Sequence, residues 1–196
     1  MTPDYGFRIT VPPATEPVPL AEAKAQCRVA LPDEDALIAG YVLAARKFVE
    51  QHTGLLLLTQ TCEMTLDAFP TNDYFEMARA PVQSVSSVTY VDTNGSPQTW
   101  PSANYVSDAF RGRPAVRLAY NASWPIARTQ ANAVTVTFVA GYGSNPGDAP
   151  EPIRQAMLLL IGHWYEHREA VNVGSTVNEF PLAVDSLLAT YRVNWL

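Results

Sequence analysis

The sequence predicts an α+β protein, in which a small bundle of about four helices is interrupted by an antiparallel β insertion, a meander or a small barrel. Apolar residues before residue 58 and after residue 145 recur at the three- and four-residue spacing of helices. Between these positions, apolar and polar residues alternate as they do in half-buried strands. We therefore expect an N-terminal helical part at residues 1–57, a β insertion at 58–145, and a C-terminal helical part at 146–196 that completes the bundle.

Two helices are predicted in the N-terminal part. The first begins at Leu20, after Pro17 and Pro19, and follows the letters LAEAKAQCRV. The second runs from about residue 33 to residue 53, with an acidic start that suits the helix dipole and Gly54 as its terminator. Its apolar face comprises Leu37, Ile38, Tyr41, Val42, Ala45, Phe48 and Val49.

The middle of the chain predicts roughly five to seven short strands, because period-two segments are separated by prolines and glycines. The letters TQTCEMTLDAF and AVTVTFVAGYG show this alternation most clearly. Asn94-Gly95 lies between two strand-like runs and is a strong hairpin signal. Short strands without intervening helical segments favour antiparallel pairing over βαβ units.

Two further helices are predicted after the β insertion. The first is expected within residues 148–171, with Pro152 near its first position. Its buried stripe comprises Ile153, Met157, Leu160, Ile161 and Trp164. A polar segment at residues 172–180 separates it from a short last helix within residues 181–193, whose common face comprises Val184, Leu187, Leu188 and Tyr191.

Composition narrows the function classes. The 196 residues are 47% hydrophobic and carry a net charge of −6, without a run of basic residues, which argues against a grip on nucleic-acid phosphates. Cys27 and Cys62 belong to no paired motif and are expected to be buried free thiols. No signal peptide and no apolar run of the ~18 residues that a spanning helix needs is apparent, so we expect a product of the host cytoplasm without a membrane partner.

One motif suggests metal chemistry. His163, Glu166 and His167 form the H-x-x-E-H pattern of one class of zinc peptidases, and the two histidines share a helix face. A catalytic zinc needs a third protein ligand, and the candidates Glu169, Glu179, Asp185 and His52 are not placed on an obvious partner helix. A helix border that carries two histidines is therefore favoured, and a zinc hydrolase remains the alternative.

A second alternative is a carbohydrate- or receptor-binding module. The β insertion is rich in aromatic residues, which either stack on sugars or fill a small β core. The second role is the more common one. The residues concerned are Tyr74, Phe75, Tyr90, Trp100, Tyr105, Phe110, Tyr120 and Trp124.

The chain resembles the head–tail connector (adaptor) proteins of long-tailed phages, prophages and gene transfer agents. The resemblance is carried in order by the helical start LAEAK with DEDALI, the helix exit ExxTG, the run APVQSVSSVTYVDTNGSPQTW, the segment VTFVAGYG before PEPIRQAMLLLIGHWYEHREAV, and the final PLAVDSLLATYRV. These segments span nearly the whole chain. Pro19 departs from the family, where a capping Ser or Thr is usual, but proline also suits a helix start.

This resemblance implies a structural protein of the virion head–tail junction, with no catalytic residue, metal or cofactor. Subunits would form a ring of about twelve copies below the portal protein, extend the DNA channel, and contact a downstream connector, stopper or tail protein. DNA would pass through without sequence-specific binding, and acidic residues facing the bore would repel its phosphates.

Two groups of residues fit these contacts. Charged residues at helix edges are expected to pair between subunits and to add specificity: Glu34, Arg46, Lys47, Glu166, Arg168 and Glu169. The last segment is apolar and aromatic with one arginine, the composition of an interface anchor, and is expected to dock into the portal unless it packs on its own bundle. It comprises Tyr191, Arg192, Val193, Asn194, Trp195 and Leu196.

Overall fold

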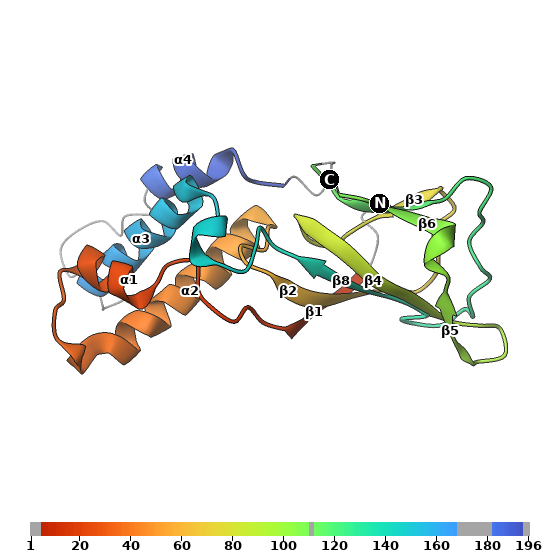
Figure 1. Ribbon diagram of the computed structural model, residues 1–196, viewed down its shortest axis with the longest axis horizontal. Coiled ribbons are helices and arrows are strands. Elements are labelled where there is room, and N and C mark those ends of the chain that lie inside the picture. The colour runs from red at the N-terminus through yellow and green to blue at the C-terminus, as the bar shows by residue number, and fades with distance from the viewer. Residues whose placement is uncertain (1–4, 110–111, 168–181, 194–196) are drawn as a thin grey trace, which may run out of the picture. The chain divides into compact units, whose positions relative to one another are not determined.

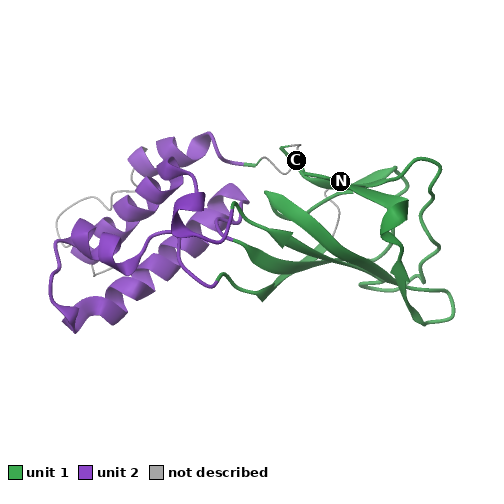
Figure 2. Ribbon diagram, viewed as in Figure 1, with its two compact units in different colours: residues 1–13, 59–142, 193–196 green, residues 14–58, 143–192 purple. Residues whose placement is uncertain are grey.

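The structure is a computed structural model that describes residues 5–109, 112–167 and 182–193 (Figure 1). The chain divides into two compact units (Figure 2). The β unit comprises residues 1–13, 59–142 and 193–196, and the helical unit comprises residues 14–58 and 143–192. The predicted α+β class, with four helices and antiparallel sheets, is confirmed over the described residues.

The β unit contains two open antiparallel sheets, and neither closes into a barrel within the described part of the chain. The larger has the order β1-β2-β8-β4-β5, so strands distant in sequence lie side by side. Its strands are β1 (Tyr5–Val11), β2 (Gln60–Leu66), β8 (Val134–Ala140), β4 (Val82–Val91) and β5 (Pro97–Trp100). The smaller has the order β3-β7-β6, with β3 (Tyr74–Glu76), β7 (Ala115–Leu118) and β6 (Tyr105–Asp108).

Strict alternation in β2 and β8 builds the core of the larger sheet. Both strands bury every second residue, as their sequence pattern predicts. Cys62 is paired in register with Phe138, and Met64 with Val136, so that all four side chains share the buried face. Cys62 is a buried free thiol, as expected, whereas Cys27 is only half-buried.

The predicted Asn94-Gly95 turn connects β4 to β5, and Asp92 organises it. Gly95 has a φ of +87°, which glycine adopts without strain. The Asp92 carboxylate accepts hydrogen bonds from the backbone N–H groups of Asn94 and Ser96, each at 2.9 Å, and from the Gln98 amide at 2.9 Å. The turn is therefore held by a side chain that sequence reasoning overlooked.

Replacing Asp92 with alanine is expected to speed amide hydrogen exchange in the β4–β5 hairpin several-fold. The bond from the Ser96 N–H, followed by that from Gln98, lowers the pKa of Asp92. A lowered pKa means that this stabilisation is present above the unfolded-state pKa and is lost as pH falls through the folded-state pKa. The protection of the Ser96 N–H, which is its intrinsic exchange rate divided by the observed rate at the same pH, should therefore fall in acid in the parent protein more steeply than in Asp92→Ala. The exposed neighbour Thr93→Ala is the control. Exchange in the hairpin of Asp92→Ala no faster than in Thr93→Ala would contradict this role.

The helical unit contains α1 (Leu20–Cys27), α2 (Asp35–Thr53), α3 (Glu151–Glu166) and α4 (Leu182–Ala189). The short 3-10 turns η1 (Pro32–Glu34) and η3 (Pro146–Asp148) precede α2 and α3, and a third, η2 (Ser102–Asn104), precedes β6. Gly54 ends α2 in the left-handed conformation, as predicted, and its N–H bonds the Glu50 carbonyl at 3.0 Å. The α3 helix packs against each of the other three helices.

The core of the helical unit follows most of the predicted apolar faces, but Leu37, predicted on the apolar face of α2, is exposed. Its fully buried side chains come from all four helices and from the segment after α2. The set includes Ile38, Val49, Leu56, Leu57, Ile153, Met157, Leu160, Ile161, Val184 and Leu188. Within the described residues, no helix is both long and apolar enough to span a membrane.

Candidate functional site

The H-x-x-E-H motif lies at the end of α3, and the described residues around it do not assemble a metal site. The ring centroids of His163 and His167 are 4.6 Å apart, and the His167 Nδ1 lies 3.1 Å from the His163 carbonyl oxygen. No cluster of three or more His, Cys, Asp or Glu residues suited to a metal occurs among the described residues. Asp185, a candidate third ligand, lies 3.4 Å from His52 instead. Glu169 and Glu179 lie outside the described residues.

Trp164, which follows the first histidine of the motif, packs against α2, as expected from the sequence. Its ring lies 6.4 Å from that of Tyr41 and 6.4 Å from that of Phe48, both on α2. The Phe48 contact is edge-on, a favourable geometry for aromatic rings. This packing fixes which side of α3 faces α2.

The side of α3 that faces away from α2 borders a groove within the helical unit. The groove has a volume of about 310 Å³. Residues from three helices line it, namely Gln26, Cys27, Leu159, Gly162, His163, Tyr165, Glu166 and Ala183. Burial, followed by the charges of Glu166 and Glu34, raises the pKa of the Cys27 thiol, which therefore stays protonated at neutral pH. The groove thus combines apolar and polar lining residues with an acidic border.

Three of the predicted interface residues lie at accessible positions of the helical unit. Lys47 on α2 and Glu166 on α3 are exposed. Glu34 is half-buried, and its carboxylate accepts a hydrogen bond from the Tyr165 hydroxyl. Arg168 and Glu169 lie outside the described residues.

Arg46 differs from the exposed edge that the sequence suggested. Arg46 is buried, with only 5% of its surface exposed to solvent. Its guanidinium donates to Glu16 at 2.7 and 3.3 Å and to Glu50 at 3.1 Å. Burial alone would lower the pKa of Arg46, but the hydrogen bonds and charges of Glu16 and Glu50 outweigh it and raise that pKa. Arg46 therefore organises the interior of its own subunit.

A second arginine, Arg154 on α3, connects α3 with α1 and with the segment before α1. It donates to Glu22 of α1 at 2.6 Å, to Glu151 at 2.7 Å, and to the Pro17 carbonyl at 3.0 Å. Sequence reasoning did not single out this residue. Its bonds fix α1 and the segment before it against α3.

The aromatic residues of the β unit form a packed cluster rather than an open platform. The Trp124 ring lies 5.1 Å from Phe69 and 5.0 Å from Trp100, and its N–H donates to the Asn72 carbonyl at 2.7 Å. Trp100 is only 4% exposed. Sugar stacking needs free ring faces, which these contacts occupy. Of the other predicted members, Phe75, Tyr90 and Tyr105 contact the cluster, and Tyr74 stacks against Arg117.

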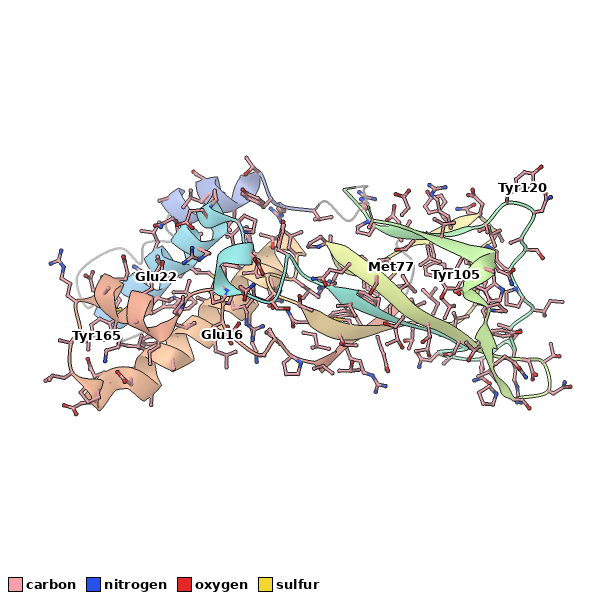
Figure 3. The ribbon with its side chains drawn as sticks, in the orientation of Figure 1. Glu16, Glu22, Met77, Tyr105, Tyr120 and Tyr165 are labelled. Carbon is pink, nitrogen blue, oxygen red and sulfur yellow. The ribbon has the colours of Figure 1, made fainter. Side chains whose placement is uncertain are left out.

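Tyr120 is the clear exception to this packing. It lies in the loop after β7 and is 94% exposed (Figure 3). One isolated tyrosine is not a platform, because sugar recognition requires several polar groups around the stacked ring. Phe110 lies outside the described residues.

The predicted portal-docking segment is described only in part. Tyr191 and Val193 are half-buried, whereas Arg192 is exposed. The Tyr191 N–H donates to the Leu188 carbonyl at 2.9 Å and continues the end of α4. Asn194, Trp195 and Leu196 lie outside the described residues.

Comparison with known proteins gives consistent matches. A sequence model of the family described as head completion protein matches residues 19–193. The chain is similar to a solved structure from the neck of an empty gene transfer agent particle with C6 symmetry, at 25% identity and a TM-score of 0.81 over 96% of each chain. A structure from the virion of a native gene transfer agent particle matches at 25% identity and a TM-score of 0.81, over 96% of this chain and 95% of that chain.

A third structure, from the neck of a native gene transfer agent particle with C12 symmetry, shares the fold. Its identity is 23% and its TM-score 0.79, over 96% of each chain. No curated protein sequence matches the chain.

The family match covers all four described helices and every described strand except β1. The match confirms the predicted role as a structural head–tail connector protein of the virion. A structural role excludes the alternative of a zinc hydrolase. The resemblance read from the sequence is therefore correct at the level of the family. The chain belongs to the head completion protein family.

Proposed function

We propose that this protein is a ring-forming adaptor that docks beneath the portal, extends the DNA channel and offers a face to the next connector or tail protein. The observation that carries the proposal is its likeness, over 96% of both chains, to a protein from a gene transfer agent neck with C6 symmetry. Cyclic symmetry requires each subunit to present two different complementary faces. The helical unit offers exposed charged and apolar positions that suit such faces.

The acidic character of the chain fits passage of DNA through the ring. Each chain carries a net charge of −6, so about twelve copies form a strongly acidic collar. Where this charge faces the bore, it repels phosphates and prevents tight, sequence-specific binding. The proposed partners are therefore further copies of this chain, the portal protein and a downstream connector, stopper or tail protein.

We expect a ring of about twelve subunits when the purified protein is added to heads that carry the portal. Cryo-electron microscopy of these heads with and without the protein measures both the ring and its position. A ring below the portal with an acidic lumen is the expected result. Protein that stays monomeric and leaves the portal bare, or a ring whose lumen is basic, would contradict the proposal.

A further inference from the structure

One surface of α2 has no partner within its own helical unit. Ala36, Gly40, Leu43 and Lys47 are exposed and recur at four- and three-residue spacing, so they form a single stripe along the helix. Leu43 is 39% exposed, and a side chain added at Gly40 would meet nothing within 4 Å. The half-buried Tyr41 and Phe48 side of α2, which contacts Trp164, is a different face of the helix. We refer to these four residues as the α2 stripe.

The groove lies on the opposite side of α3 from α2. Leu159, Gly162 and Glu166 line it, and they recur at three- and four-residue spacing. Gly162 and Glu166 are each two residues from Trp164, which corresponds to about 200° around the helix axis. Figure 1 shows α3 running between α2 and α4. The α2 stripe and the groove therefore face away from each other, as the two halves of a head-to-tail contact must.

The chemistry of the two surfaces is complementary. The α2 stripe is small and apolar and ends in the cation Lys47. The groove is lined partly by apolar and small residues, including Leu159 at 38% exposure, and carries the carboxylate of Glu166 at its border. Neither Lys47 nor Glu166 has an ion-pair partner in the part of the chain that the structure describes. Small residues let a second helix approach closely, and the opposite charges set its register.

We propose that the α2 stripe of one subunit docks into the groove of the next copy, with Lys47 facing Glu166 across the contact. This inference rests on the ring of the proposed function and specifies how that ring closes. When this contact is repeated around the ring axis, each subunit uses its α2 stripe toward one neighbour and its groove toward the other.

Substituting Gly40 with glutamine tests the α2 stripe without disturbing the subunit. The space around Gly40 is open, and glutamine is a better helix former than glycine, so the variant should fold at least as well as the parent. Gly147→Gln is the matched control, since Gly147 also has open space but lies outside both surfaces. We expect Gly40→Gln to lower the fraction of subunits in rings roughly tenfold or more, and the control to assemble normally. Equal assembly of the two variants overturns the inference.

Cys27 reports on the groove in the unmodified chain. It lines the groove, whereas Cys62 is fully buried in the β unit, so N-ethylmaleimide should label Cys27 selectively in free subunits. We expect labelling of Cys27, followed by mass spectrometry, to slow roughly tenfold or more in rings on portal-bearing heads. Rings in which Cys27 reacts at the free-subunit rate overturn this inference alone. Failure of the parent protein to form rings at all instead overturns the proposed function.

Charge reversal tests the pairing itself. Lys47→Glu and Glu166→Lys should each lower assembly roughly tenfold, because each places like charges across the contact. The double variant should restore assembly, since it re-creates the opposite pair in reverse order. A double variant that assembles no better than the worse single variant shows that the two residues do not face each other and overturns the inference.

Discussion

Replacing Arg46 with alanine is expected to lower the free energy of unfolding by about 3–5 kcal/mol. Glu50 is buried beside Arg46, and its carboxylate would lose the cation that neutralises it. The same carboxylate also accepts the Leu57 N–H at 3.0 Å, which fixes the buried segment after α2. Glu16, the second partner, would lose its only described anchor to α2. Denaturant unfolding followed by far-UV circular dichroism measures this loss.

The neighbouring residue provides the control for Arg46. Lys47 is exposed one position further along the same helix, so Lys47→Ala should change stability by no more than about 0.5 kcal/mol. Changing both Arg46 and Glu50 to apolar residues should recover part of the loss, because no charge is then left buried alone. An Arg46→Ala variant as stable as Lys47→Ala would show that the arginine is not part of the interior.

The helices were largely predictable because the spacing of apolar residues within each helical segment already marks its buried face. In α2 and α3 the apolar spacing marked the buried faces, and Gly54 marked the end of α2. The β1 strand was missed, although its sequence alternates. As an edge strand it buries little of its surface, and the strand it pairs with, β2, lies about fifty residues further along the chain. The signal was present in the alternating apolar residues Tyr5, Phe7, Ile9 and Val11.

Side-chain partners were less predictable than helices, and Arg46 shows why. It was grouped with charged edge residues because arginine is usually exposed. Its position carried a contrary signal, since it lies four residues after Val42 and eight after Ile38, in phase with the buried face. Its partner Glu16 comes from outside the helix, so the pair exists only after tertiary folding.

The groove could not be read from the sequence for the same reason. Its walls come from α1, α3 and α4, which are brought together by the packing of the helical unit. The exposed charges Lys47 and Glu166 were predicted individually as interface residues, and that role remains a prediction. Their opposite signs are visible in the sequence, but the sides of the helical unit on which they lie became apparent only from the packing of Trp164 against α2.

Removing residues 191–196 is expected to abolish attachment to portal-bearing heads, with a loss of roughly a hundredfold or more in affinity. The segment contains a tyrosine, a tryptophan and an arginine, the residue types that most often dominate interface energies. Arg192 is exposed at the end of the helical unit, where a partner can reach it. Binding of the truncated protein to heads, measured by co-sedimentation and imaging, tests the docking role.

Two measurements separate docking from folding and from ring formation. Circular dichroism should be nearly unchanged, because the buried residues of α4, Val184 and Leu188, precede the deletion. The truncated protein should also protect Cys27 as well as the parent does under conditions that yield rings without the portal, because the groove lies elsewhere. If the truncated protein attaches normally but unfolds at a lower temperature, residues 191–196 pack on their own bundle and the portal is held by another surface. The single change Arg192→Ala, which removes no half-buried side chain, should weaken attachment roughly tenfold while leaving the unfolding temperature unaltered.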